Sequence, residues 1–333
     1  MTVTVGGRLR TAVLAHVQTW RPYTVWYVGL LGLAGAGLAG ERRLLWLVVA
    51  WAIPTLGWLG GHYLSDWFDR DLDAVSKPHR PIPSGRLAAR TALGWGTTAM
   101  LAVAVLAVIS GWPTAVVAAC AVVAVVAYGL FLKAVGLGGN LVRGLLGALT
   151  LLFGAAVVPM FDRRVLVFAL AFWLHDCASN LVGTLRDVAG DAAGGYRTLP
   201  VRHGTPTAVW TAVAFYAAAI VAAVIGAVAF GGGAGPGHLV PLAAVAVVGV
   251  VALAPLVPRR RALPVRVALR AHEVLVLERL GLAATVVGLG LGVATAVALL
   301  VPMAALTWWT QRRMRTWYEL GPAERPAERM ADA

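Results

Sequence analysis

The stretch SDWFDRDLDAVSKPHRPIPSGRL, residues 65–87, directly follows a long apolar run and concentrates acidic side chains. Only nine acidic residues precede position 270, and four of them lie within this stretch. On a helix that turns about 100° per residue, Asp66, Asp69 and Asp73 share one face. Three converging carboxylates, followed by Lys77 and Arg80, predict a site for a divalent metal and a polyanion.

The composition places this stretch in a membrane protein. Of 333 residues, 59% are hydrophobic and only 13% are charged, and the mean hydropathy is +0.78. A soluble domain of this length is less apolar, so the chain is predicted to be polytopic. Cys120 and Cys177 lie in apolar runs without the spacing of a zinc site or a disulfide framework. The N-terminus lacks the pattern of a signal peptide and is expected to form an amphipathic segment over 1–21.

Apolar runs of about 20 residues predict an all-α bundle of nine transmembrane helices. The predicted spans are 22–39, 44–64, 91–111, 113–133, 141–159, 165–185, 206–229, 239–257 and 281–304. Short links containing Gly and Pro separate most of them. We therefore expect one domain over 22–306, followed by a polar C-terminal tail over 307–333.

The basic residues predict how the chain is oriented. If the N-terminus is cytoplasmic, 19 of the 28 Lys and Arg residues fall in cytoplasmic segments. Because basic residues concentrate in such segments, this orientation is favoured. It places the acidic clusters on the cytoplasmic side and the C-terminus outside. Arg312, Arg313 and Arg315, after the ninth span, argue against the external C-terminus. The net charge of +13 fits loops that face anionic lipid. Neither nucleic acid nor a protein partner is indicated.

A second acidic cluster repeats the first. Thr184, Asp187 and Asp191 have the spacing of Asp66, Asp69 and Asp73, shifted by 118 positions. The sequence RPIPSG from position 80 is echoed by RTLPVRHG from position 197. Each cluster follows an even-numbered span, so the repeating unit is about four helices. Such repeats commonly place a shared site at their interface.

The chemistry of these side chains suggests a magnesium-diphosphate site. Carboxylates without His or Cys suit Mg²⁺, which is commonly completed by substrate phosphates. The candidate metal ligands are Asp66, Asp69, Asp73, Asp187 and Asp191, with Asn180 and Thr184 as neutral oxygen donors. The cations expected to stabilise a departing diphosphate are Lys77, Arg80, Lys133, Arg197 and Arg202. A diphosphate whose hydrocarbon tail belongs among membrane helices is an allylic prenyl diphosphate.

These motifs resemble the UbiA superfamily of intramembrane prenyltransferases. The resemblance rests on the run 66–87, on YGLFLK at 128–133 and on the run 186–204, and it extends over nearly the whole chain. It implies nine transmembrane helices with Asp-rich motifs after the second and sixth. It also implies that Asp66, Asp69 and Asp73 bind the first Mg²⁺ and that Asp187 and Asp191 bind the second.

The resemblance further implies which residues act on the substrate. Tyr128 and Lys133, together with Lys77, Arg80 and Arg197, match positions that contact diphosphate in the family, and Arg21 is a weaker match. The expected reaction is Mg²⁺-dependent transfer of a prenyl group to a small aromatic acceptor.

The chain departs from the family pattern at Ser65, where Asn is usual, and at Gly183 and Thr184, where Lys and Asp are usual. The altered second motif keeps open a terpene cyclase on the same scaffold, which would act on a prenyl diphosphate alone. A non-catalytic lipid or isoprenoid transporter is the other alternative, but transport sites tend to lie near the bilayer midplane rather than at helix ends.

Overall fold

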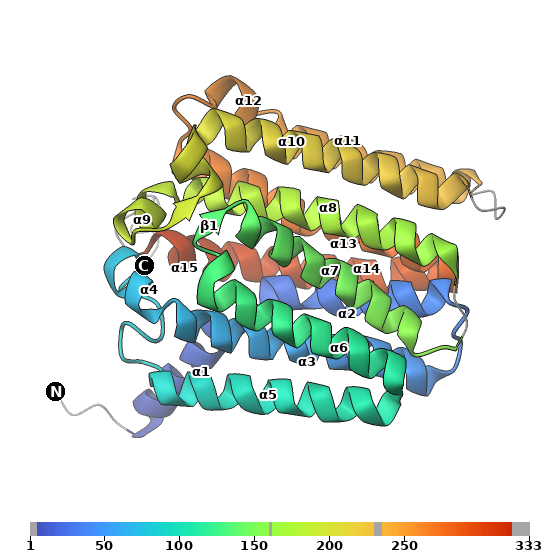
Figure 1. The fold of residues 1–333 in the computed structure, drawn as a ribbon, viewed down its shortest axis with the longest axis horizontal. Helices are drawn as coiled ribbons and strands as arrows, with labels where there is room; N and C mark the ends of the chain where they lie inside the picture. The colour runs from blue at the N-terminus through green and yellow to red at the C-terminus, as the bar shows by residue number, and fades with distance from the viewer. Residues whose placement is uncertain (1–4, 160–161, 230–234, 322–333) are drawn as a thin grey trace.

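The computed structural model describes residues 5–159, 162–229 and 235–321. Its long helices lie side by side in one bundle, and short helices gather at one end (Figure 1). The helices are α1 (Val5–Trp20), α2 (Pro22–Leu38), α3 (Leu44–Phe68), α4 (Arg70–Ser76), α5 (Ala89–Ser110), α6 (Trp112–Ala127), η1 (Tyr128–Leu132), α7 (Gly138–Ala156), α8 (Arg163–Arg186), α9 (Val188–Ala193), α10 (Leu199–Val228), α11 (Pro236–Leu253), α12 (Leu256–Arg259), α13 (Val265–Leu291), α14 (Val293–Thr310), η2 (Gln311–Arg315) and α15 (Thr316–Leu320).

The all-α membrane fold is confirmed. In the described part of the chain, nine helices are long and apolar enough to cross a membrane, as many as the sequence predicts. They are not the same nine segments, because α2 has only 17 residues and stands outside that count. The predicted last span, 281–304, instead contains the boundary between α13 and α14.

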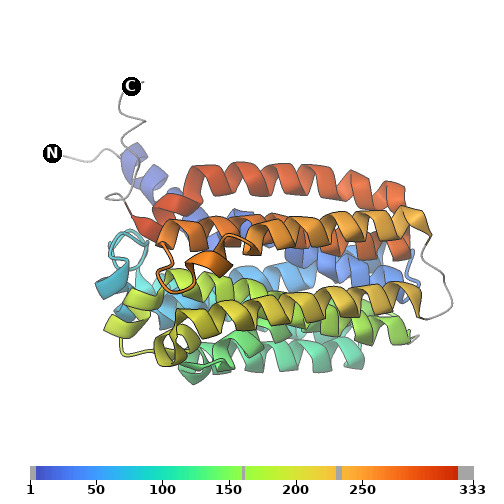
Figure 2. The same cartoon turned by 90° about the horizontal axis from the view of Figure 1, so that it is seen from above.

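Gly292 reverses the chain inside that predicted span. Its φ of 92° lies in the region that glycine adopts most readily, and it ends α13 and begins α14. As a result α15 lies at the same end of the bundle as α1 and α4 (Figures 1 and 2). The first and last described helices thus lie at one end of the bundle, whereas the sequence predicts the two termini on opposite sides of the membrane. Residues 322–333 of the predicted tail lie outside the described residues.

Charged residues inside α13 explain the error. The charges of Glu278 and Arg279 lower the hydropathy of this stretch of sequence, which therefore predicts a loop. In the structure both side chains are buried. Glu278 accepts a hydrogen bond from Tyr216 (3.1 Å) and contacts His175 Nε2 (2.5 Å). The network joins α13 to α10 and α8, and it supplies partners that buried polar groups require.

Helix α2 lies at the centre of the bundle, with 13 of its 17 residues buried. Glycines let its neighbours approach closely. A Cβ added at Gly32 would lie 2.0 Å from the Ala50 carbonyl of α3, and one at Gly35 would lie 1.9 Å from the Leu151 carbonyl of α7. Small residues at contacts of this kind are typical of helix packing in membranes.

The outer helices expose apolar side chains. Val105 of α5, Val123 of α6, Val251 of α11 and Val301 of α14 are each more than half exposed. Such faces suit contact with lipid, where all backbone polar groups must be satisfied within the helices. The two acidic clusters instead lie at the end of the bundle that carries the short helices α4 and α9.

Two short connections meet at that end. The helix α4, which follows α3, contacts α9, which follows α8 (Figure 1). The strands β1 (Val135–Gly136) and β2 (Arg197–Thr198) form a small parallel pair, with Val135 opposite Arg197. The two acidic clusters, more than 100 residues apart in sequence, are thereby brought to one site.

Candidate active site

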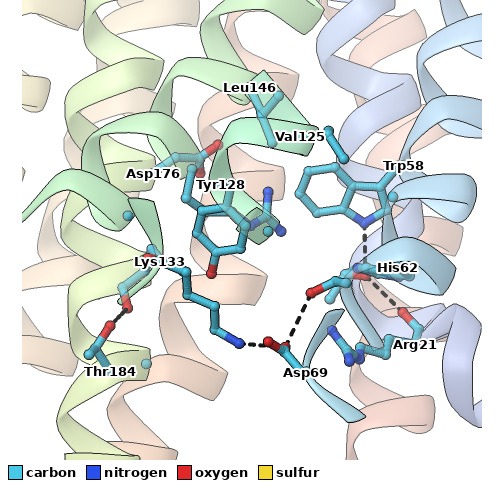
Figure 3. A pocket seen from close by; sticks show the side chains of 18 of the residues that line it. Arg21, Trp58, His62, Asp69, Val125, Tyr128, Lys133, Leu146, Asp176 and Thr184 are labelled. Carbon is cyan, nitrogen blue, oxygen red and sulfur yellow. Dashed lines mark hydrogen bonds and ion pairs between the residues drawn. The ribbon is translucent and has the colours of Figure 1, made fainter. Parts of the chain in front are cut away.

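One cavity of about 490 Å³ lies beneath the two acidic clusters. Its polar part is lined by Asp69 and Asp73 from the first cluster and by Asp187 and Asp191 from the second. Figure 3 shows Asp69 and Lys133 pointing toward one another across this part, with Tyr128 beside them. The structure thus brings four of the five predicted metal ligands to one cavity; the fifth, Asp66, is buried next to it.

Each carboxylate of the first cluster contacts a different cation. Asp66 pairs with Arg21, and Asp69 pairs with Lys133. Both carboxylate oxygens of Asp73 lie 3.0 Å from Arg80 Nη1. The chain bends between α3 and α4 at Asp69, so Asp66 lies on one helix and Asp73 on the other. The three side chains are almost completely buried, and the cations offset the cost of burying their charge.

The second cluster contains two unlike carboxylates. Asp187 Oδ1 lies 2.8 Å from Lys77 Nζ, and its Oδ2 lies 2.8 Å from Arg186. Burial would raise the pKa of Asp187, but these two cations hold it well below its usual value. Asp191 accepts a hydrogen bond from Thr198 at 3.2 Å. Burial and the neighbouring Asp187 raise the pKa of Asp191 to about 6.

The neutral donors of the second cluster are held by a residue that the sequence analysis did not identify. The amide of Asn140 donates to Asn180 Oδ1 at 2.8 Å and to Thr184 Oγ1 at 3.1 Å. All three residues line the cavity. Asn140 at the start of α7 therefore fixes both oxygen atoms in place.

The residues present fit Mg²⁺ by their chemistry. The donor set consists of carboxylate, amide and hydroxyl oxygens, which suit a hard cation. In the described residues, no three acidic, His or Cys side chains already converge as a preformed metal site. The carboxylates are instead paired with cations, so metal binding would have to exchange those partners. The assignment of individual ligands stays a prediction.

The predicted cations divide into two groups. Lys77, Arg80 and Lys133 line the cavity, as does Tyr128. Arg197 and Arg202 are exposed, and neither is among the cavity-lining residues of the described chain. Arg197 follows the acidic cluster in sequence, but its backbone pairs with the β1 segment, where Arg197 N donates to the Ala134 carbonyl at 2.8 Å.

The sequence analysis missed several charged residues of the cavity. Arg186, beside Asp187, lines it together with Glu319 of α15. Arg143 and Arg279 line a deeper part of the cavity. Arg143 lies within the predicted span 141–159, whereas Arg279 lies between two predicted spans. An ionisable side chain within an apolar helix is a signal for a functional site. That signal identifies Arg143, but the sequence offers no comparable sign for Arg279 or Glu319.

The deeper part of the cavity is basic on one side. Arg143 stacks on Trp58, with its guanidinium carbon 4.0 Å from the ring centroid, and has no ion-pair partner in the described part of the chain. The Trp58 ring lies 5.4 Å from that of His62. His62 Nδ1 contacts the Trp20 carbonyl at 3.0 Å, so this nitrogen must be the donor and Nε2 is left as an acceptor.

Asp176 is the carboxylate that faces Arg143 and Arg279. Arg279 approaches it at 3.6 Å and lies over the Tyr27 ring. Tyr27 also donates a hydrogen bond to Asp176 at 3.1 Å. One carboxylate against two guanidinium groups gives this part of the cavity an excess of positive charge.

An apolar branch completes the cavity. Its lining includes Ile53 of α3, Val103 of α5, Val117 and Ala121 of α6, and Phe153 of α7. The cavity therefore joins a charged part at the end of the bundle to a hydrocarbon-like part between the helices. A ligand with an anionic head and an apolar tail matches this division.

Comparisons with known proteins agree with this arrangement. A model of the UbiA prenyltransferase family matches residues 23–274. The digeranylgeranylglyceryl phosphate synthase of Methanopyrus kandleri is 32% identical over 60% of this chain and 74% of its own length. The corresponding synthase of Korarchaeum cryptofilum is 32% identical over 47% of this chain, and the match spans 56% of that protein, a little over half its length.

Solved structures share the fold. A UbiA homologue from Aeropyrum pernix K1 aligns with a TM-score of 0.68 at 16% identity, covering 79% of this chain and 96% of that one. A UbiA homologue from Archaeoglobus fulgidus, bound to GPP and Mg²⁺, aligns with a TM-score of 0.60 at 12% identity, covering 89% and 99%.

Proposed function

The chain belongs to the UbiA prenyltransferase family and is a prenyltransferase, and we propose that it transfers the prenyl group of an allylic prenyl diphosphate to an anionic acceptor with the help of Mg²⁺. The observation that carries this proposal is the continuous cavity that joins carboxylates and cations to an apolar branch. The diphosphate would lie in the charged part and the prenyl tail in the apolar branch.

Five side chains would hold the metal: Asp66, Asp69, Asp73, Asp187 and Asp191. When bound, Mg²⁺ would neutralise negative charge on the diphosphate. Lys77, Arg80, Lys133 and Arg186 now contact carboxylates, and they would donate to the phosphate oxygens instead. Charge-assisted hydrogen bonds of this kind stabilise a leaving group as its charge develops.

The reaction breaks the bond between the allylic carbon and the diphosphate oxygen. The electron pair leaves with the diphosphate, and an acceptor oxygen or carbon forms the new bond and loses a proton. His62 lines the cavity with Nε2 available as a proton acceptor. The apolar walls would exclude water, which would otherwise capture the carbon electrophile.

The acceptor is proposed to carry a phosphate or carboxylate near Arg143 and Arg279. The excess positive charge beside Trp58 supports this choice. So do the relatives named digeranylgeranylglyceryl phosphate synthase, whose name describes a product that carries a phosphate. An aromatic ring, expected from the sequence, stays a prediction, because two guanidinium groups select for charge rather than for aromaticity.

Purified protein would test the proposal when incubated with Mg²⁺ and prenyl diphosphates of several lengths. Acceptors would be supplied as matched pairs with and without a phosphate or carboxylate, and products identified by mass spectrometry. We expect diphosphate release and a prenylated anionic acceptor. Release of a cyclic hydrocarbon without acceptor would identify a cyclase instead, and Mg²⁺-dependent binding without diphosphate release would identify a transporter or binding protein.

One variant separates the acceptor part of the cavity from the diphosphate part. Arg143→Gln is expected to raise KM for an anionic acceptor at least about tenfold, because a charged hydrogen bond contributes about 1.5–3 kcal/mol. KM for the prenyl diphosphate should stay nearly constant. An unchanged KM for the acceptor would exclude Arg143 from its binding.

A further inference from the structure

We propose that the C-terminal helix α15 is an internal plug, whose Glu319 carboxylate occupies the place of the substrate diphosphate. The proposal rests on the proposed function, because it takes Lys77, Arg80 and Arg186 to be the cations that bind diphosphate. The segment lies outside residues 23–274, which match the family model. It reaches the site because the chain reverses at Gly292.

Glu319 contacts three cations of the cavity at once. Its Oε2 lies 3.0 Å from Arg80 Nη2 and 3.5 Å from Lys77 Nζ, and its Oε1 lies 3.2 Å from Arg186 Nη1. The Glu319 side chain is only 9% exposed. A carboxylate that bridges three cations through both oxygens has the charge and the geometry with which a phosphate group is recognised.

The neighbouring residue acts on the first acidic cluster. The Tyr318 hydroxyl donates to Asp66, with 3.2 and 3.1 Å to the two oxygens, and accepts from Arg21 at 2.7 Å. The Tyr318 ring lies beneath the Arg80 guanidinium, 4.5 Å from its central carbon. Tyr318 therefore engages a predicted metal ligand while Glu319 engages the predicted diphosphate ligands.

Hydrogen bonds from neighbouring segments hold η2 and α15 in place. Arg315 is 1% exposed and lies 2.7 Å from His272 Nδ1. His79 Nε2 donates to the Tyr318 carbonyl at 3.1 Å. The π-helical turn η2 separates α15 from the long helix α14, and such turns occur frequently at functional sites.

Simultaneous occupancy by Glu319 and a diphosphate is unfavourable. Both are anions that require the same three nitrogen groups, so each would lie beside an unneutralised like charge. Substrate binding therefore requires Glu319 to move out. Because the plug belongs to the same chain, its effective concentration is fixed by covalent attachment and does not fall on dilution.

The apparent affinity for diphosphate is therefore the intrinsic affinity of the open site multiplied by the fraction of molecules in which the site is free. The test is titration of purified full-length protein with inorganic diphosphate and Mg²⁺ by calorimetry. Glu319→Gln keeps the size of the side chain and removes its charge, and it should lower Kd about tenfold if the plug is closed in nine molecules of ten. KM for the prenyl diphosphate should fall by a similar factor.

Glu273→Gln is the matched control. Glu273 pairs with Arg270 in α13 and is not among the cavity-lining residues of the described chain. Its Kd for diphosphate should equal that of the wild type. Tyr318→Phe is a second test that leaves all charges in place; losing the hydroxyl contacts with Asp66 and Arg21 should also lower Kd, by a few-fold.

Opposite results would overturn the proposal. A higher Kd in Glu319→Gln would make Glu319 a part of the ligand site, and an unchanged Kd in both variants would make the contact incidental. The two proposals fail separately. Tighter diphosphate binding without prenyl transfer in any variant would refute the proposed function and keep the plug, whereas turnover with unchanged Kd would refute only the plug.

Discussion

Replacing Lys133 by Met tests the leaving-group site, because Lys133 both neutralises a buried carboxylate and faces the diphosphate region. The Asp69 side chain is 5% exposed and that of Lys133 is 26% exposed. Removing one partner of a buried pair typically costs about 3–5 kcal/mol. Since Lys133 is partly exposed, we expect the lower end of that range. This corresponds to a fall in Tm of about 6 °C, at about 2 °C per kcal/mol for a chain of this size.

The kinetic effect is expected to be larger than the effect on stability. Loss of one preorganised donor to a developing anion typically lowers kcat about 10²–10³-fold. Diphosphate release at saturating substrate would measure this loss, and tryptophan fluorescence during heating would measure Tm. The double variant Asp69→Asn with Lys133→Met should recover most of the Tm but not kcat, since it removes the unpaired charge without restoring the donor.

Arg164→Met supplies the control. Arg164 also pairs with an aspartate, Asp162, but that pair is partly exposed and lies at the start of α8, at the far end from the acidic clusters. Exposed pairs contribute at most about 1 kcal/mol, so neither Tm nor kcat should change much. Turnover by Lys133→Met within about threefold of the wild type would refute the leaving-group role. An unchanged Tm would refute the importance of the Asp69 pair.

Three further predictions follow from the packing and the cavity. Gly154→Ala should destabilise by about 1–3 kcal/mol, because its Cβ would lie 1.9 Å from the Gly32 carbonyl, whereas Gly94→Ala meets no atom within 4 Å and should be neutral or stabilising in thermal unfolding. Ala121→Phe fills the apolar branch and should shift product analysis toward shorter prenyl chains, whereas Ala119→Phe, on an exposed face of α6, should not. Arg197→Gln should keep kcat within about threefold in the diphosphate-release assay, since Arg197 is exposed outside the cavity.

The parts of the site that the sequence predicts are those defined by local spacing. Asp69 and Asp73 follow one apolar run and Asp187 and Asp191 follow another, so their placement at helix ends needs no knowledge of tertiary structure. Their meeting at one cavity follows from the contact of α4 with α9. The proposed internal repeat predicted this proximity, but the four-helix repeat itself stays a prediction.

The parts that could not be predicted depend on the direction in which side chains point. Arg197 and Arg186 flank the same acidic cluster in sequence, but Arg186 on the last turn of α8 faces the cavity and Arg197 in β2 does not. Glu319 forms an ion pair with Lys77, although the two residues are 242 positions apart in sequence. Neither the orientation of the two arginines nor the contact between Glu319 and Lys77 can be derived from residue spacing or hydropathy. Both depend on where the chain reverses and on which helix faces pack together.

The reversal at Gly292 also resolves a conflict in the charge distribution. With the C-terminus placed outside, Arg312, Arg313 and Arg315 contradicted the rule that basic residues concentrate in cytoplasmic segments. In the structure these residues form η2, next to α15, at the same end as Lys77 and Arg80 (Figure 1). Adding them to the 19 basic residues assigned to inside segments gives 22 of 28. This distribution agrees with the prediction that this end is cytoplasmic, where a water-soluble diphosphate could leave. The same basic turn would then place the α15 plug at the cytoplasmic membrane surface.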